Sequence, residues 1–265
     1  RRQTRRAGHH ENRHRRARRR RRHKRVRPPV GRRLSALCRL QGDRQPDLSQ
    51  RPFLRPDPGP VHRAHNLTGE VALFVGHLHP RKGIHYLIEA WAFLPEALQR
   101  ANTLLLVGDG SERKRLEARA AALKAHNIVF AGPVPFRELA AYYAAADFLV
   151  LPTLLDVWGL VVNEAMASGL PVLCSKYAGC AEELIIPGKT GDIFDPTDVA
   201  AFSALLARWL QTPHTTPDPA IQEHIQRWNF DSSMRGILEQ LVSVGILSPD
   251  EAAFAPQPTK PSASS

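Results

Sequence analysis

Short apolar runs alternate with amphipathic stretches between residues 71 and 210, and this alternation constrains the fold more than any other feature of the chain. Five apolar runs predict buried strands, at residues 71–75, 103–107, 127–130, 148–151 and 171–174. The intervening and following stretches predict helices, at residues 84–94, 111–124 (with Ser111 as N-cap), 137–146, 160–167, 181–185 and 199–210. Strands that alternate with helices predict an α/β fold with a doubly wound parallel sheet.

In such a sheet, helices cover both faces and ligands bind beyond the carboxyl ends of the strands. A binding site is therefore expected in the loops that follow the predicted strands, which cover residues 76–83, 108–111, 131–135, 152–159 and 175–180.

Charge is distributed very unevenly along the chain. The formal net charge is +12, but residues 1–68 hold 22 Lys or Arg and 4 Asp or Glu, whereas residues 69–265 hold 15 and 21. The Arg-rich segment 1–68 has too little apolar surface to offset its chain entropy, so we expect it to be disordered. We interpret its composition first as a reading-frame or start artefact of a GC-rich gene, second as a solvated tail, and third as a nucleic-acid-binding segment. The third reading is the least favoured because stacking aromatics are scarce there.

The expected organisation is a single α/β domain over residues 69–212, a linker with a C-terminal helix over 213–248, and a disordered Pro/Ser/Ala-rich tail over 249–265. No apolar run is long enough for a transmembrane helix, and no signal peptide is recognisable. The three cysteines (Cys38, Cys174 and Cys180) lack metal-site spacing. We therefore expect a cytoplasmic protein with reduced thiols and no metal, and leave peripheral contact with a membrane open.

The segment from Asp156 to Pro171 is the strongest candidate for a site. It places two carboxylates, Asp156 and Glu164, on either side of Gly159, where a strand and loop lead into a helix N-terminus. The unpaired amides there favour anions. A diphosphate could bind these amides, with the carboxylates available to the hydroxyls of attached sugars. Each residue alone has a plainer interpretation: Glu164 as the exposed stripe of a core helix, and Asp156 as a helix cap.

The loop from Gly76 to Gly83 is a second candidate, because it also joins a strand to a helix. It contains four side chains that can carry positive charge (His77, His79, Arg81 and Lys82), a composition that suits a diphosphate. A solvated basic turn is an equally good explanation of this loop taken alone, and its spacing matches neither the P-loop nor the GxGxxG motif.

Together these segments resemble the C-terminal, nucleotide-sugar-binding domain of the group 1 (family 4) retaining glycosyltransferases. The similarity extends from about Val71 to Leu210, in the order Phe74–Gly83, Leu105–Gly110, Phe130–Val134, Asp156–Val172, Gly179–Glu182 and Gly188–Gly191. The resemblance implies one Rossmann-like domain, the C-terminal half of a two-domain GT-B fold. It also implies a donor that is a UDP- or GDP-linked sugar, no metal cofactor, and an acceptor that is a glycan, a lipid or a small molecule.

The resemblance also implies roles for individual residues. Lys82 matches the lysine that binds the donor diphosphate, and Glu164 matches the glutamate that binds the ribose hydroxyls. Asp156 occupies the acidic position that faces the transferred sugar, so it is the expected catalytic residue. The backbone amides of Gly159, Leu160 and Val161 are expected to bind the phosphates.

Three features depart from the family pattern. His77 stands where the family usually has arginine, and it cannot form a bidentate fork with phosphate. Asp156 stands where the family usually has glutamate. Residues 1–68 do not resemble an acceptor-binding domain, so we expect a truncated enzyme. Two alternatives remain: a nucleotide-sugar epimerase or phosphorylase of similar fold, and a non-enzymatic protein that binds nucleic acid through its Arg-rich segment.

Overall fold

The computed structural model describes residues 56–228, 238–246 and 248. Six parallel strands form one sheet in the order β3-β2-β1-β4-β5-β6. Their bounds are β1 Val71–Val75, β2 Thr103–Val107, β3 Ile128–Gly132, β4 Phe148–Leu151, β5 Val172–Ser175 and β6 Gly191–Phe194. This order is that of a Rossmann-like sheet, and it confirms the predicted doubly wound α/β fold.

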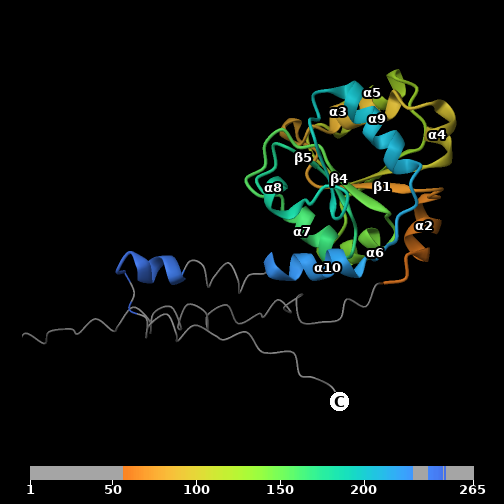
Figure 1. Cartoon of the computed structure of the whole chain (residues 1–265). Coiled ribbons are helices and arrows are strands. Elements are labelled where there is room, and N and C mark those ends of the chain that lie inside the picture. Colours follow the sequence, from red (N-terminus) through yellow and green to blue (C-terminus); the bar gives the residue numbers. More distant parts are fainter. Residues whose placement is uncertain (1–55, 229–237, 247, 249–265) are drawn as a thin grey trace, which may run out of the picture. The chain divides into compact units, whose positions relative to one another are not determined.

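Helices cover both faces of the sheet (Figure 1). One face carries α3 (Ile84–Ala92), α5 (Arg113–Ala122) and α9 (Val199–Leu210). The other face carries α2 (Gly59–His65), α6 (Leu139–Ala144), α7 (Leu160–Ala167), α8 (Ala181–Leu184) and α10 (Pro219–Ile225). The remaining elements are α4 (Glu96–Ala101) and the short 3-10 helices η1 (Pro80–Lys82), η2 (Phe136–Glu138) and η3 (Gln226–Trp228).

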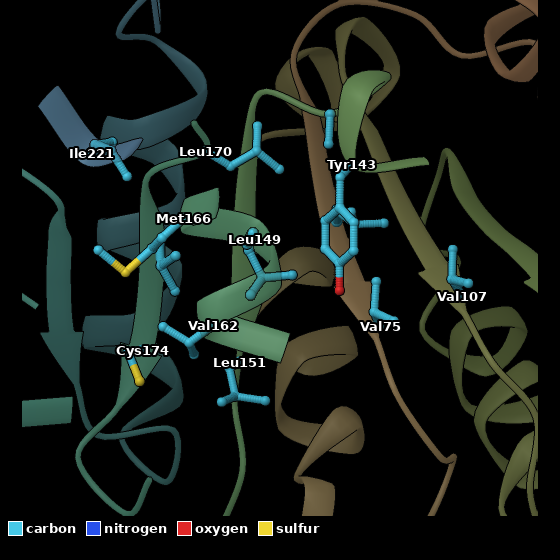
Figure 2. Close-up of a cluster of buried hydrophobic side chains, with 14 of the residues drawn as sticks. Val75, Val107, Tyr143, Leu149, Leu151, Val162, Met166, Leu170, Cys174 and Ile221 are labelled. Carbon is cyan, nitrogen blue, oxygen red and sulfur yellow. The ribbon is translucent and has the colours of Figure 1, made fainter. Parts of the chain in front are cut away.

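The alternation of side chains along each strand divides the core into two layers. Val71, Leu73 and Val75 of β1 belong to the cluster beneath α7, while Ala72 and Phe74 belong to the cluster beneath α3. Successive strand residues point to opposite faces, so a strand that is covered on both sides must be apolar throughout. Figure 2 shows part of the first cluster, to which α7 contributes Val162 and Met166, β4 contributes Leu149 and Leu151, and α10 contributes Ile221.

Several predicted boundaries need correction. The helix expected from Ser111 begins at Arg113, and its N-cap is Glu112, which makes no capping hydrogen bond through its side chain. The helix expected at 137–146 is divided into η2 and the shorter α6. Strand β3 extends to Gly132, two residues beyond the prediction. Helix α7 spans residues 160–167, as predicted, because Gly159 and Gly169 bound it on either side.

Residues 56–68 are ordered, although we expected segment 1–68 to be disordered. Helix α2 lies there, and Val61 and Leu67 are buried in the core with 7% and 9% of their surface exposed. Asn66 ends the helix in a left-handed conformation. A few apolar contacts are enough to order a short segment beside a sheet that is already formed. Residues 1–55, which contain Cys38 and most of the Arg-rich segment, lie outside the described residues.

The sequence prediction also missed two elements after residue 187. No strand was expected between residues 185 and 199, yet β6 pairs with β5 from Gly191 to Phe194. In the expected linker, α10 is capped by Asp218 and packs on α7 through the buried Ile221 and Ile225. The expected C-terminal helix is present over residues 238–243 of the described part of the chain, and the tail 249–265 lies outside the described residues.

Candidate functional site

The loop between β1 and α3 carries His77 and Lys82 at the carboxyl edge of the sheet. His77 is exposed, whereas Lys82 is half-buried at the end of η1. The ring Nδ1 of His79 accepts a hydrogen bond from the backbone N–H of Arg81 at 3.3 Å, which caps η1. Gly83 then adopts φ +66°, a left-handed conformation that favours glycine, and starts α3.

The loop after β4 lies directly against the loop after β1. The backbone N–H of Leu154 donates to the carbonyl of Arg81 at 2.7 Å, and the buried hydroxyl of Thr153 donates to the same carbonyl at 3.1 Å. A Cβ atom at Gly83 would lie only 2.0 Å from the carbonyl oxygen of Pro152. The two loops are therefore in backbone contact, which brings Lys82 next to Asp156.

Lys82 and Asp156 form an ion pair. The distance from Lys82 Nζ to Asp156 Oδ2 is 2.5 Å, and the two side chains are only 15% and 19% exposed. The sequence pointed to both residues as site residues, but not to their direct contact. The pair is a fixed cation beside a fixed carboxylate at the mouth of the sheet.

Asp156 is also held from the other side, by the loop after β5. Its backbone N–H donates to the carbonyl of Tyr177 at 3.3 Å, and its own carbonyl accepts from Gly179 at 3.0 Å. Between the same two loops, the backbone N–H of Cys180 donates to the carbonyl of Trp158 at 3.1 Å. Both backbone groups of Asp156 are thus engaged, which restricts where its carboxylate can point.

Helix α7 begins directly after this loop, at the residue we expected. Gly159 is its N-cap, with φ +98°, and Leu160 in the first turn is 69% exposed. The first amides of a helix have no intrahelical partners, and the helix dipole makes this end positive. The amides that follow Gly159 therefore face a region in which an anion would be stabilised.

Glu164 lies one turn further along α7 and is half-buried. Its Oε2 accepts a hydrogen bond of 2.6 Å from the hydroxyl of Tyr143 on α6. The ring of Tyr143 is only 3% exposed and belongs to the cluster that contains Val75 and Leu149 (Figure 2). Burial, followed by the charge of Glu164 and the hydrogen bond, raises the pKa of Tyr143 well above its usual range.

An open pocket of about 550 Å³ lies at the carboxyl ends of β1, β2 and β3. Its lining comes from the ends of these strands and the loops that follow them: Val75, Gly76, His77, Val107, Gly108, Asp109, Gly110, Pro133, Val134 and Leu139. His77 therefore faces this pocket, whereas Lys82 and Asp156 meet at the neighbouring loop. The exposed surface of the pocket walls is largely apolar.

The structure thus relates the candidate residues in different ways. It pairs Lys82 with Asp156, places Gly159, Leu160 and Val161 at the start of α7, and places His77 at the pocket. Sequence reasoning missed Tyr143, for which the only signal was its position in a helix that precedes β4. Cys174 and Cys180 are buried and have free thiols, in keeping with a packing role.

In the described ranges, no group of three or more His, Cys, Asp or Glu side chains is placed to hold a metal ion. In that same part of the chain, no helix combines the length and apolar character that crossing a bilayer requires.

Comparison with known proteins identifies the family. The family profile described as "Glycosyl transferases group 1" matches residues 61–226. A GDP-mannose-dependent alpha-(1-6)-phosphatidylinositol monomannoside mannosyltransferase of Mycolicibacterium smegmatis is 36% identical over 172 residues, which are 60% of this chain and 44% of the relative. A D-inositol 3-phosphate glycosyltransferase of Acidothermus cellulolyticus is 31% identical over 189 residues, which are 65% of this chain and 40% of the relative. The chain thus spans less than half the length of these two relatives.

The fold also matches solved structures of GT-B glycosyltransferases. A sucrose-phosphate synthase from Thermosynechococcus elongatus superposes with a TM-score of 0.60 at 30% identity, covering 70% of this chain and 49% of that protein. Anabaena HepE in complex with UDP-glucose superposes with a TM-score of 0.55 at 25% identity, covering 71% and 52%. The family match and the Rossmann-like sheet agree, and the chain therefore belongs to the group 1 glycosyl transferases.

Proposed function

We propose that this chain binds a nucleoside-diphosphate sugar and serves in the transfer of that sugar, with retention of configuration, to a glycan, lipid or small-molecule acceptor. The proposal rests on one observation: three kinds of chemical group lie at the same edge of the sheet. Lys82 supplies a cation, the start of α7 supplies amides that have no partners within the helix, and Glu164 supplies a carboxylate. These groups match the diphosphate and the ribose of such a donor.

The diphosphate would bind at the start of α7, on the amides of Gly159, Leu160 and Val161. Lys82 would contribute a positive charge from the facing loop. As the bond between the sugar and the phosphate breaks, negative charge grows on the departing diphosphate. Donors and cations that already point to this place stabilise that charge at no cost in reorganisation, so no metal is needed in this proposal.

Glu164 would accept hydrogen bonds from the ribose hydroxyls, and the base would occupy the pocket lined by Val75, His77 and Val134. Asp156 would face the transferred sugar, where its carboxylate orients the ring or stabilises positive charge on it. One relative is a GDP-mannose-dependent enzyme, and one structural neighbour was solved in complex with UDP-glucose. Both UDP- and GDP-linked donors therefore fit the proposal.

The acceptor is proposed only as a class. One relative is named for a phosphatidylinositol mannoside, which supports a lipid-linked acceptor and contact with a membrane surface. The chain spans 44% of that relative, so transfer by the whole protein is part of the proposal. Donor binding depends on fewer residues than transfer does, and it is therefore the first property to test.

Calorimetric titration of the full chain with UDP and with GDP tests the proposal. We expect at least one of them to bind, and Glu164→Ala to weaken it by about tenfold or more, since a lost hydrogen bond to a charged group costs about 1.5–3 kcal/mol. The control is Glu96→Ala on α4, an exposed carboxylate that pairs with Arg100 and precedes β2 at the opposite edge of the sheet. Well-folded protein that binds neither nucleotide would refute the proposal.

A further inference from the structure

We propose that Tyr143 is a positioning residue for Glu164, and that its buried hydroxyl holds the carboxylate in the orientation that binds ribose. The inference rests on the proposed function, because it assigns Glu164 the role given above. It adds a residue outside the site loops, on a different helix from Glu164 and 21 positions away in the chain.

The contact itself is specific. The Tyr143 hydroxyl donates to Glu164 Oε2 at 2.6 Å, a distance typical of a strong hydrogen bond to a carboxylate. Tyr143 projects from α6 into the cluster beneath α7, where its ring is 3% exposed. The ring is therefore fixed by packing, and the hydroxyl marks a fixed point beneath the glutamate.

The Tyr143 hydroxyl requires a hydrogen-bond partner, because the cluster around the ring is apolar. Phenylalanine would fill the same space without a polar atom, and a buried hydroxyl is costly unless it is hydrogen-bonded. Glu164 satisfies it. The high pKa of Tyr143, due to burial and to the charge of Glu164, keeps the hydroxyl protonated and therefore a donor.

The hydrogen bond also leaves Glu164 able to bind a ligand. An ionised carboxylate has two oxygens with about four acceptor positions, and Tyr143 occupies one of them. The remaining positions suffice for the two hydroxyls of a ribose. Without Tyr143 the glutamate side chain would sample more rotamers, and the ligand would have to order it on binding.

The experiment combines one substitution with one change in the ligand. Tyr143→Phe keeps the ring and removes the hydroxyl. Wild type and variant are titrated with UDP or GDP, whichever binds wild type more tightly, and with its 2′,3′-dideoxy analogue, which lacks the hydroxyls that Glu164 would bind. We expect the Kd of the natural nucleotide to rise about tenfold in Tyr143→Phe, in line with one hydrogen bond to a charged group. The Kd of the dideoxy analogue should change less than about twofold, because that ligand does not use Glu164.

The matched control is Tyr142→Phe, which removes a hydroxyl from the same helix. Tyr142 hydrogen-bonds His65 at 3.1 Å instead of Glu164, so its loss should leave both Kd values unchanged. The Tyr143→Phe effect should also disappear in a Glu164→Ala background.

Three results would overturn the inference. Equal weakening of both ligands in Tyr143→Phe would indicate a general structural role. An unchanged Kd for the natural nucleotide would show that Glu164 does not need the hydroxyl, while leaving the proposed function intact. Failure of wild type to bind either nucleotide would remove the proposed function and this inference with it.

Discussion

Lys82 Nζ lies 2.5 Å from Asp156 Oδ2, although 74 positions separate the two residues in the chain. One follows β1 and the other follows β4, which are neighbours in the sheet. The cation proposed for the diphosphate is thus paired with the carboxylate proposed for the sugar. A diphosphate must share Lys82 with Asp156 or draw it away.

This relationship predicts different effects on nucleotide binding for two substitutions. Lys82→Met should weaken binding of UDP or GDP by about tenfold or more, because it removes a positive charge from the site and leaves Asp156 unpaired. Asp156→Asn should leave binding of the bare nucleotide unchanged or tighten it, because it removes a competing negative charge. Parallel calorimetric titrations measure both Kd values. Equal losses in the two variants would mean that the pair acts as one structural unit.

A negative charge introduced at the start of α7 should weaken nucleotide binding without lowering the stability of the fold. Leu160 is 69% exposed in the first turn, so Leu160→Glu fits without a clash, and its charge suits the positive helix end. We therefore expect the denaturation midpoint to stay the same or rise, while nucleotide binding falls by about tenfold or more through repulsion of the diphosphate. Leu160→Gln, of the same length without charge, is the control. Undiminished binding in Leu160→Glu would place the diphosphate elsewhere.

The side chain at position 77 should affect nucleotide binding through its charge and shape. Arginine carries a permanent charge and can form a bidentate fork with phosphate, which histidine cannot. His77→Arg should therefore tighten nucleotide binding by a few-fold, an estimate based on one exposed charge pair. Calorimetric titration at a single pH compares it with wild type and with His77→Gln, which carries no charge. If all three proteins bind with the same Kd, His77 does not contact the phosphates.

Gly83 should resist substitution more than Gly188, a glycine of similar backbone conformation. A Cβ there would lie 2.0 Å from the carbonyl oxygen of Pro152, and φ is +66°. Gly188 has φ +73°, but a Cβ there would meet nothing within 4 Å. We expect Gly83→Ala to cost about 2 kcal/mol or more of unfolding free energy, and Gly188→Ala about 1 kcal/mol. Urea denaturation followed by tryptophan fluorescence gives both values, and equal costs would show that the loops can separate.

Glu70 should make the stability of the folded chain depend on pH, independently of the candidate site. It precedes β1 at the opposite edge of the sheet, and its buried Oε2 has no hydrogen-bond partner among the described residues. Burial, and secondarily the Asp147 carboxylate, raise the pKa of Glu70 from 4.5 to about 7. The folded state therefore retains a proton that the unfolded state releases between these values. Its contribution to stability is complete below pH 4.5 and is lost as the pH rises through about 7.

Glu70→Gln should remove this loss of stability at high pH, because the amide does not ionise. We expect the variant to exceed wild type in urea midpoint at pH 8 and to gain less, or nothing, at pH 4.5. Nucleotide binding should not change. A wild-type midpoint that rises between pH 5 and 8, with no difference in Glu70→Gln, would contradict the assignment.

The fold was readable from the sequence because strands covered on both faces are apolar throughout. β1, β2 and β4 have the predicted bounds, and α7 does too because glycine flanks it. Elements with few apolar residues were missed, such as α10, which is held by Ile221 and Ile225. The pairing of Lys82 with Asp156 also could not be predicted from the sequence. It depends on the order of strands in the sheet, and alternation along the chain does not determine that order.

The candidate site was predictable in its parts but not in its connections. The loops that follow the strands stood out by their charge and by the glycine before α7. Tyr143 did not stand out, since its importance comes from a contact between two helices that no local pattern records. The individual roles of Lys82, Asp156 and Glu164 in binding stay predictions until they are measured.

The adjacency of β1 and β4 also has a consequence for folding. Strands β1 to β3 come from the first half of the domain and β4 to β6 from the second, and the two halves meet along the β1–β4 seam. The Lys82–Asp156 pair spans that seam, so it forms only when both halves have docked. Long-range contacts of this kind are slow to form. The gain of nucleotide binding during refolding should therefore report the docking of the two halves.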